Sequence, residues 1–517
     1  MPPAPSALIR RDWVILAAIV LLGVGLRLYR VDWQSAWPDE HYTLHAAGKP
    51  VGAMIQLIVQ DYVHPPLHYL LLYLWMKAFG FGVFQARLLS VVFGSLAVIM
   101  IYLLARRLFD RRTGILAALV LAVSQLAISH SQEARPYALT LLLTLCSIYL
   151  FLMAAREKRI WAWWGFAGSS TLMLYSHYYA VFVLISLFLI SFVFRKRYAV
   201  PLRWWLAAAA VLCVAYIPWL ASGVVEQALM SRKLVRPAGA TAMTVRSFSF
   251  FSSLNWFNNG KWSGIYLPSP LWTYPVGGLL FTLPALLAIL PLRKKPDTAR
   301  EAWLLLAVLW LLPMGLVLSL GLLKLQYDVR YVAFSMAPYY VLVAHGFQQP
   351  GSLRLRRILV FAMLAYSLSA LHANYFIPFK GDYRGACAYL ASVYQEGDCC
   401  SFMPARKEGE IPIYWLVHQR NHPGLKTTTL DDALSGRTEC SRIWLVWDYA
   451  WFRNLNPDHE REVRRELETG YSRTDGKRFF GLDVSRYLPR QPSLQSHISL
   501  RAAKIPRGGQ FPTPLKN

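Results

Sequence analysis

Residues 64–80 read His-Pro-Pro-Leu-His-Tyr-Leu-Leu-Leu-Tyr-Leu-Trp-Met-Lys-Ala-Phe-Gly, and this stretch decides the topology of the chain. Its apolar part, residues 67–79, is about 13 residues long, whereas a helix needs about 20 to cross a bilayer. We therefore expect it to lie along the outer membrane surface, with Tyr69, Tyr73 and Trp75 at headgroup depth. Counting it as a span would place every later basic loop outside the cell.

On either side of this stretch, apolar runs alternate with short basic clusters as far as residue 376. With 517 residues, of which 56% are hydrophobic, the chain is too apolar to form one soluble core. It therefore belongs in a membrane. We expect about eleven spans, near residues 13–29, 86–105, 115–130, 137–155, 161–177, 178–194, 204–220, 272–292, 302–323, 332–347 and 358–376.

The basic clusters set the orientation of these spans. Arg10 and Arg11 precede the first span, and the Arg and Lys clusters of alternate later loops fall on the same side, which is therefore the cytoplasm. We expect a multi-pass protein of the plasma (inner) membrane with a cytoplasmic N-terminus. The first run lacks a small-residue cleavage site and is expected to be retained. The net charge of +26 is also explained by these Lys and Arg clusters in the loops, so we expect no nucleic-acid partner.

The character of the chain changes after residue 376. Residues 377–490 mix charged residues with short alternating runs, and an odd number of spans places them outside the cell as a small α/β domain. We expect strands at 442–447 and 479–484, and helices at 383–394 and 459–467. Residues 491–517, rich in Pro and Gly, read as a disordered tail. The predicted domains are thus 1–376, 377–490 and 491–517.

Four cysteines lie in the expected outer domain: Cys387, Cys399, Cys400 and Cys440. An oxidising compartment allows disulfides there. Four cysteines permit three pairings, of which the bridge between adjacent Cys399 and Cys400 is the least suited. The pairing stays open at this point.

The first outer loop, residues 31–85, carries the adjacent carboxylates Asp39 and Glu40 directly after a proline. In an extended segment their side chains point to opposite sides. We expect one to face a reacting centre and to accept a proton, while the other pairs with a cation or a substrate hydroxyl. The alternative is a solvated acidic turn.

Arginines at other outer loops are candidates for binding a phosphate. Arg135 suits bidentate capture of a phosphate, and Tyr137 offers a hydroxyl beside it. Tyr327 and Arg330 occupy a later outer turn, and Arg87 opens the second span. The alternatives are contacts with lipid headgroups, pairing of Arg135 with Glu133 or of Arg330 with Asp328, and, for Arg87, a topological anchor.

Two outer histidines, His64 and His177, complete the set of candidate substrate-binding residues. A divalent metal held by them together with Glu40 or Asp61 is the alternative, but these residues lack a ligand-like spacing. We therefore expect hydrogen-bonding roles for both histidines, and no metal or other cofactor.

Taken in order, these motifs resemble those of the GT-C membrane glycosyltransferases. This group includes protein O-mannosyltransferases, the aminoarabinose transferases that modify lipid A, and rhizobial lipopolysaccharide transferases. The resemblance rests on Asp39-Glu40, His64 to Leu67, Ala86 to Leu88, Gln132 to Tyr137, and Arg330-Tyr331. It implies a GT-C fold for the membrane part, with Asp39 as the base, Glu40 in support, and Arg87, Arg135 and Arg330 as phosphate ligands.

The resemblance also implies a reaction. We expect an inverting transfer of a hexosyl or pentosyl group from a polyprenyl-phosphate sugar to a hydroxyl of a lipid, glycan or protein, on the extracytoplasmic face and among membrane lipids. The main alternative is a transporter or flippase for a lipid-linked or anionic substrate. That alternative calls for spans broken near the bilayer midplane and for halves related by a repeat.

Overall fold

The computed structural model describes residues 10–194, 198, 200–230, 253–259, 270–288, 297–322, 329–403, 411–422, 424–434, 437–449 and 457–490. These residues form two compact units. The first, called here the helical unit, comprises the described residues up to Asp32 and from Ala46 to Ile377. The second, the α/β unit, comprises Trp33–His45 and the described residues from Pro378 onward. The expected tail, 491–517, lies outside the described residues.

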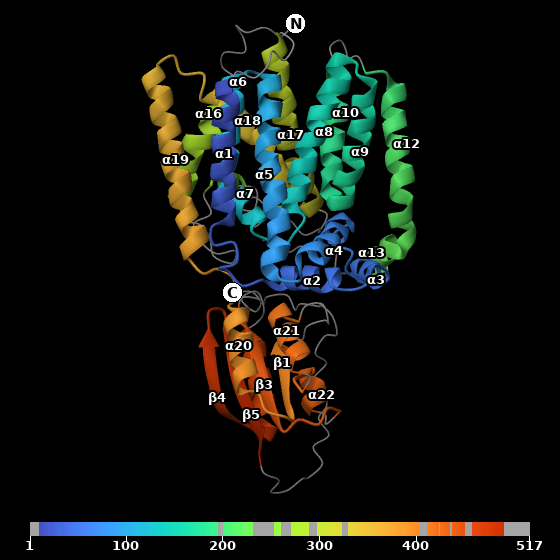
Figure 1. Cartoon of the computed structure of the whole chain (residues 1–517), viewed down its shortest axis with the longest axis vertical. Coiled ribbons are helices and arrows are strands. Elements are labelled where there is room, and N and C mark those ends of the chain that lie inside the picture. Colours follow the sequence, from blue (N-terminus) through green and yellow to red (C-terminus); the bar gives the residue numbers. More distant parts are fainter. Residues whose placement is uncertain are drawn as a thin grey trace. The chain divides into compact units, whose positions relative to one another are not determined.

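The helical unit is a bundle of long helices that run side by side, with the short helices α3 and α4 lying across one of its ends (Figure 1). Helix α4 (Leu67–Phe79) has only 13 residues, so the apolar run after the Pro65-Pro66 pair is a short helix, as expected. The other elements are α1 (Arg10–Leu28), α3 (Val51–Asp61), α5 (Val83–Leu108), α6 (Arg111–Ala122), α7 (Gln125–Ser131), α8 (Tyr137–Glu157), α9 (Ile160–Ser176), η1 (Tyr178–Ala180), α10 (Val181–Val193), α12 (Leu202–Trp219), η2 (Leu220–Val224), α13 (Val225–Met230), α15 (Thr273–Gly277), η4 (Gly278–Thr282), α16 (Leu283–Leu287), α17 (Asp297–Leu322), η6 (Val329–Ser335), α18 (Met336–Gly346) and α19 (Leu353–Phe376).

Helical segments lie in all of the apolar runs that the sequence analysis marked as spans. Within the described part of the chain, five helices are long and apolar enough to cross a membrane, or six if one bent pair counts as a single span. That pair, α6 and α7, corrects the prediction of one straight span at 115–130. The two helices meet at an angle of 59°. The chain breaks here because Val123 ends α6 and the Ser124 side chain caps α7, accepting a bond from the Ala127 N–H.

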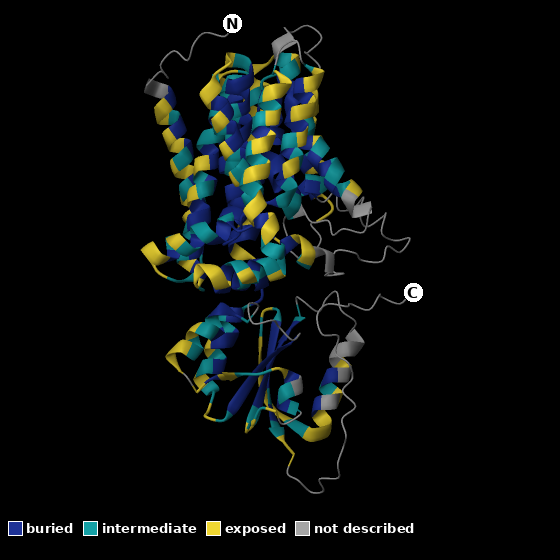
Figure 2. Ribbon diagram, turned by 90° about the vertical axis from the view of Figure 1, so that its right-hand side faces the viewer, coloured by how far each residue is buried: buried dark blue, intermediate teal, exposed yellow. Residues whose placement is uncertain are grey.

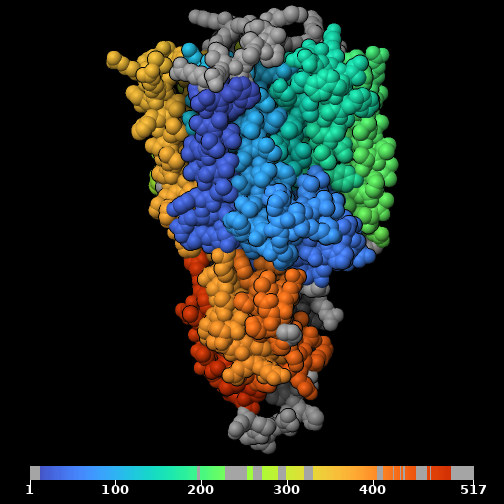
Figure 3. Space-filling model, in the orientation of Figure 1, coloured from blue at the N-terminus to red at the C-terminus, as the bar shows by residue number. Residues whose placement is uncertain are grey.

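Helix α18 lies in the core of the bundle, and all of its residues are buried. At its end, Gly346 passes so close to Pro284 of α16 that an added Cβ would lie 1.9 Å from the Pro284 carbonyl oxygen. Buried residues fill the inner faces of the helices, and exposed residues follow their outer faces (Figure 2). Helix α12, at the edge of the bundle (Figure 3), belongs to the least buried of the five candidate spans, as expected for a helix that faces lipid.

The α/β unit contains a five-stranded sheet in the order β2-β1-β3-β5-β4. Strand β1 (Asp398–Met403) pairs in parallel with β2 (Lys426–Thr427) and β3 (Arg442–Asp448). Strand β5 (Leu482–Pro489) pairs antiparallel with β3 and with β4 (Tyr471–Phe479). The small α/β domain expected after residue 376 is therefore present as a mixed sheet with helices.

Helices cover both faces of this sheet. Trp444 and Val446 of β3 pack on one face with α20 (Tyr383–Val393) and with Trp415 of α21 (Ile413–Asn421). The alternate residues of β3 pack on the other face, with α22 (Leu430–Leu434) and α24 (Pro457–Gly470). Because neighbouring side chains on a strand point to opposite faces, β3 is buried on both sides and reads as one apolar run.

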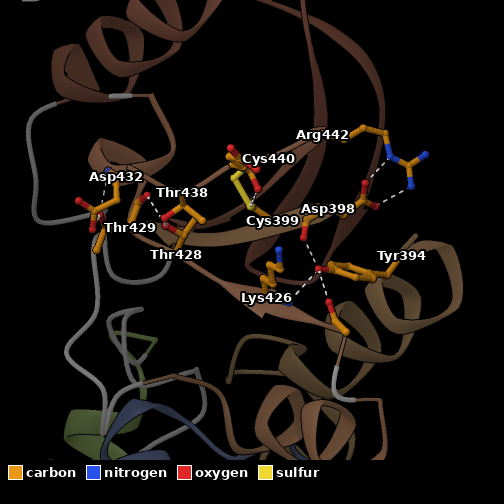
Figure 4. Close-up of a disulfide and its surroundings, with 12 residues drawn as sticks. Tyr394, Asp398, Cys399, Lys426, Thr428, Thr429, Asp432, Thr438, Cys440 and Arg442 are labelled. Atoms are coloured by element: carbon orange, nitrogen blue, oxygen red, sulfur yellow. Dashed lines mark hydrogen bonds and ion pairs between the residues drawn. A yellow bond between two sulfur atoms is a disulfide. The ribbon is translucent and has the colours of Figure 1, made fainter. Parts of the chain in front are cut away.

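Two sequence predictions for this unit have clear outcomes. The single strand expected at 479–484 is partly right: residue 479 ends β4 and residues 482–484 begin β5, but a turn at 480–481 separates the two strands, and Gly481 in it has a φ of +72°. The open cysteine pairing resolves to Cys399–Cys440, which links β1 to the segment before β3 (Figure 4). Beside the disulfide, the Arg442 side chain donates to both carboxylate oxygens of Asp398, at 2.5 and 2.6 Å.

Candidate functional site

The helical unit gathers buried histidines and arginines at the ends of its helices. His64 directly precedes the Pro65-Pro66 pair, and Pro66 caps α4 in the helical region of φ and ψ. Proline has no N–H to leave unpaired at a helix start, so the helix begins there. This places His64 just before α4 and His68 in its first turn. Both side chains are buried.

Arg135 and Tyr137 reach the same region by a similar route. Pro136 caps α8 and accepts the backbone N–H of Thr140 at 2.8 Å, so Tyr137 is the first residue of that helix. Arg135 lies just before the cap, and both it and Tyr137 are buried. The free N–H groups and the dipole at a helix start favour a negative charge nearby.

His177 completes the group from the end of α9, where its extended backbone (φ −157°) separates this helix from η1. Its ring centroid lies 5.2 Å from that of His64 and 6.2 Å from that of Tyr137. The His64 and Tyr137 rings are 6.0 Å apart. Arg330, in η6, is close enough for its charge to act on His64. We call His64, His68, Arg135, Tyr137, His177 and Arg330 the histidine–arginine cluster.

The imidazoles of this cluster have unused hydrogen-bonding capacity. In the part of the chain that the structure describes, neither ring nitrogen of His64, His68 or His177 has a hydrogen-bond partner. All three side chains are almost completely buried. Because a buried polar group without a partner costs free energy, three of them around one arginine indicate a place for a ligand.

The histidines are neutral at physiological pH. Burial, and next the positive charge of Arg135, lower the pKa of His68 and that of His177 to about 3. Burial and the same arginine, followed by His177 and Arg330, hold the pKa of His64 well below its usual value. A neutral imidazole offers one N–H donor and one acceptor nitrogen. The arginines therefore supply the fixed positive charge of the cluster, and the histidines supply adaptable hydrogen bonds.

Three side chains of this region were not among the predicted site residues, although two of them, His68 and Glu133, were expected on the same outer face. His68 follows His64 by one helical turn, a spacing that places both at one helix start. His130, at the end of α7, has its ring centroid 4.8 Å from that of Tyr137 and its Nδ1 4.0 Å from a carboxylate oxygen of Glu133. Glu133 was considered only as a partner of Arg135; its position beside His130 adds a buried carboxylate to the region.

Two other candidates from the sequence lie elsewhere or outside the described residues. The buried Arg87 of α5 donates to the Val31 carbonyl at 2.9 Å, and its guanidinium lies 4.0 Å from the Asp32 carboxylate. These contacts tie the start of the first outer loop to α5, so Arg87 has a structural role beside its predicted one. Tyr327 and Asp328 lie outside the described residues.

The structure also bears on the alternative of a metal. Among the described residues, no group of three or more His, Cys, Asp or Glu side chains is arranged to hold a metal ion. The expectation of a site without a metal stays a prediction.

The carboxylates Asp39 and Glu40 belong to the α/β unit, and their local structure corrects the prediction of an extended segment. They lie in the first turn of helix α2 (Pro38–Ala47), where the N–H groups of Glu40 and His41 donate to the Trp37 carbonyl at 2.8 and 3.0 Å. A proline at the first position followed by acidic residues is a favourable helix start. The two side chains diverge because neighbouring residues of a helix point in different directions.

Glu40 is completely buried and accepts a hydrogen bond from the Lys380 ammonium at 3.1 Å. Around this ion pair, the Ser35 hydroxyl donates to Asp382 at 3.2 Å and the Ala36 N–H donates to the Tyr414 hydroxyl at 2.8 Å. These bonds hold the start of α2 against the α/β unit. Asp39 is only partly buried, so its carboxylate is the more accessible of the two.

Part of the chain is similar to a known protein family. A family profile described as dolichyl-phosphate-mannose-protein mannosyltransferase matches residues 63–221. That range contains His64, His68, Arg135, Tyr137 and His177. No match was found among curated proteins.

Solved structures show the fold. The crystal structure of ArnT from Cupriavidus metallidurans in the apo state matches with a TM-score of 0.58 and 12% identity, over 92% of this chain and 98% of that one. The same protein bound to undecaprenyl phosphate gives a TM-score of 0.56, with 12% identity and the same coverage. The archaeal oligosaccharyltransferase AglB from Archaeoglobus fulgidus, in complex with an inhibitory peptide and a dolichol-phosphate, gives 0.54 with 10% identity, over 85% and 69%. This chain is therefore a multi-pass membrane protein with the GT-C glycosyltransferase fold, as the sequence motifs indicated.

Proposed function

We propose that this chain is a glycosyltransferase that takes a sugar from a polyprenyl-phosphate donor, whose phosphate binds at the histidine–arginine cluster. The observation that carries the proposal is the set of buried imidazoles without partners around Arg135. A phosphate oxygen accepts hydrogen bonds from imidazole N–H groups, and a guanidinium pairs with it bidentately. The undecaprenyl phosphate held by ArnT, which has the same fold, is a ligand of this chemistry.

The reaction follows from these roles. The hydroxyl of the acceptor attacks the anomeric carbon and inverts it, while the bond from that carbon to the phosphate oxygen breaks. The departing phosphate gains negative charge, which Arg135 and Arg330 stabilise. A carboxylate must accept the proton of the attacking hydroxyl, and we assign this role to Asp39, which is the more exposed of the two acids. The acceptor is a lipid, glycan or protein hydroxyl, and the sugar is a hexose or pentose.

The proposed setting is the outer face of the inner membrane. About eleven spans place the α/β unit outside under the positive-inside rule. The Cys399–Cys440 disulfide supports that side, since disulfides persist in oxidising compartments and rarely in the cytosol. No cofactor is proposed.

A transporter for a lipid-linked substrate is the second candidate. The observation that favours it is the bent pair α6–α7, because broken helices recur at the substrate sites of transporters. Such a protein binds a lipid phosphate without cleaving the bond to the sugar.

One experiment separates the two functions. The purified protein is incubated with radiolabelled polyprenyl-phosphate sugars, and both binding and release of polyprenyl phosphate are measured for wild type, Asp39→Asn and Arg135→Gln. For a transferase, Asp39→Asn loses turnover by about 100-fold or more and keeps donor binding, whereas Arg135→Gln binds the donor about tenfold more weakly.

The matched controls are Asp475→Asn, an exposed carboxylate of β4, and Arg159→Gln, an exposed arginine that pairs with Glu157. Both are expected to behave as wild type. The transporter would be established by three results together. Wild type binds the donor, transfers no sugar to any class of acceptor, and moves the lipid across the membrane of vesicles. Unchanged donor affinity in Arg135→Gln would overturn the assignment of the phosphate site.

A further inference from the structure

Arg27, in the last turn of α1, the helix that occupies the first expected span, is completely buried and binds both members of the bent pair α6–α7. Its Nη1 donates to the Ala122 carbonyl at 3.1 Å and its Nη2 to the Leu121 carbonyl at 3.2 Å, both at the end of α6. Its Nε donates to the Ser131 hydroxyl at 3.2 Å, at the end of α7. One guanidinium therefore spans the break between the two helices.

The chemistry of these acceptors explains why an arginine lies here. The last carbonyls of a helix have no partner within the helix, and in a membrane water does not supply one. A guanidinium carries five N–H donors in a fixed fork, so it satisfies several carbonyls at once. Within the described residues, the hydrogen-bond acceptors of Arg27 are backbone carbonyls and one hydroxyl, and none is a carboxylate.

The packing around Arg27 leaves little freedom for movement. A Cβ added to Gly94 of α5 would lie 2.1 Å from the Ser131 hydroxyl oxygen and 3.0 Å from the Arg27 Nε. Only a glycine lets α5 approach this hydrogen bond so closely. The Ser131 hydroxyl in turn donates to the Ala127 carbonyl at 2.7 Å, which fixes its rotamer.

The residue after Ser131 is held by the same part of α1. The Gln132 amide nitrogen donates to the Arg27 carbonyl at 3.0 Å and to the Tyr29 carbonyl at 2.9 Å, and its amide oxygen accepts a bond from Asn374 of α19 at 3.0 Å. Arg135 and Tyr137 of the histidine–arginine cluster follow within a few residues. The end of α1 therefore anchors the turn that carries them.

We propose that Arg27 is a positioning residue for the donor phosphate, acting through α7 and the turn that carries Arg135 and Tyr137. This inference rests on the proposed function of the histidine–arginine cluster. A charged side chain buried within a membrane span is costly and usually serves function. Here the charge holds a broken helix at a fixed angle, so that the Arg135 guanidinium meets the phosphate without reorganisation.

The test measures the Kd of polyprenyl phosphate for wild type, Arg27→Gln, Arg27→Lys, Arg135→Gln and the double variant Arg27→Gln/Arg135→Gln. We expect Arg27→Gln to raise the Kd about tenfold or more, since small displacements of a binding group cost affinity steeply. Arg27→Lys should recover part of this loss. The double variant should bind little worse than Arg135→Gln, because coupled residues are not additive.

Ser131→Ala serves as the milder variant if Arg27→Gln does not fold. It removes one hydrogen bond of Arg27 and leaves the carbonyl contacts, so a smaller rise in Kd is expected. Arg107→Gln is the matched control, because Arg107 lies in the last turn of α5, next to the start of α6 and not at the break between α6 and α7, and forms an ion pair with Glu157. It should leave the Kd unchanged. Melting temperatures of all variants separate loss of fold from loss of affinity.

The outcomes are distinguishable. Wild type that binds no polyprenyl phosphate overturns the proposed function. A different result overturns only the inference on Arg27. In that case wild type binds polyprenyl phosphate, and the Arg27→Gln and Ser131→Ala proteins are folded and bind it with an unchanged Kd. Additive losses in the double variant also overturn it, because they mean that Arg27 does not act through Arg135.

Discussion

Breaking the buried ion pair between Glu40 and Lys380 should destabilise the α/β unit strongly. The pair lies at 3.1 Å with both side chains almost fully buried. At an effective dielectric constant of about 20, Coulomb attraction at that distance is worth about 5 kcal/mol. Removing one partner leaves the other charged and buried, which typically costs about 3–5 kcal/mol. Glu40→Gln and Lys380→Met should each lose stability of this size, or about 10–20 °C in melting temperature.

The assay uses the cysteines of the structure. Cys387 and Cys400 are buried free thiols of the α/β unit, so their reaction with a thiol-reactive dye during heating reports the unfolding of that unit. Cys146 and Cys213 are first replaced by Ser, because they would report on the helical unit. The full-length protein is used throughout.

A double variant and a matched pair complete the design. Glu40→Gln/Lys380→Met leaves no isolated charge and should lose less stability than either single variant. The Arg437–Asp432 pair has the same 3.1 Å separation but is exposed, so Arg437→Gln should cost at most about 1 kcal/mol. A double variant whose loss equals the sum of the single losses would refute the reasoning, since the two charges would then be independent.

Three further predictions follow from single features of the structure. Cys399→Ser/Cys440→Ser should lower the stability of the α/β unit by about 4 kcal/mol, from the chain entropy of the loop that the disulfide closes; the same thermal unfolding assay measures this loss against the parent protein that lacks Cys146 and Cys213. Gly346→Ala should destabilise the helical unit by several kcal/mol in thermal unfolding because its Cβ meets the Pro284 backbone. Gly168→Ala, in the interior of α9 with open space around the added Cβ, should instead stabilise the unit by up to about 1 kcal/mol. Acid should destabilise the helical unit as the pH falls from about 6.5 to about 3, because the unfolded chain protonates His68 and His177 at a pH where the fold keeps them neutral; His68→Gln/His177→Gln should flatten this dependence in melting temperatures measured across the range.

Sequence periodicity and length predicted the helical unit well because its helices are set by long apolar runs. The break between α6 and α7 was not predicted, since the run from Ile115 to Ile128 contains neither Pro nor Gly between its ends. The usable signal was Ser124, a strong N-cap residue inside an apolar run. In the same way, Pro38 followed by two acids is a helix start, and treating it as extended missed α2.

Some features of the candidate site were likewise predictable from the sequence, and others were not. Clustering of His64, Arg135, Tyr137 and His177 was predictable because each lies at the end of an apolar run on the same predicted side. The partner of Glu40 was not, because Lys380 is 340 residues away along the chain and belongs to no motif. The grouping of Trp33–His45 with the α/β unit was likewise hidden, since its contacts are made by residues after Pro378.

The neutral state of the histidines suits the proposed function of the cluster as a donor-phosphate site, because such a site must also release its product. A donor phosphodiester carries one negative charge, whereas the phosphomonoester left after transfer has a second pKa of about 6 and is more negative at pH 7. A cluster of permanent cations would bind that product more tightly than the donor and would slow its release. Imidazoles with pKa values near 3 add N–H groups without adding charge. They therefore bind the donor substrate and the phosphate product with more similar affinities than permanent cations would. The contrast between two charged arginines and three neutral histidines is therefore expected where a phosphate is bound, changes charge, and must leave.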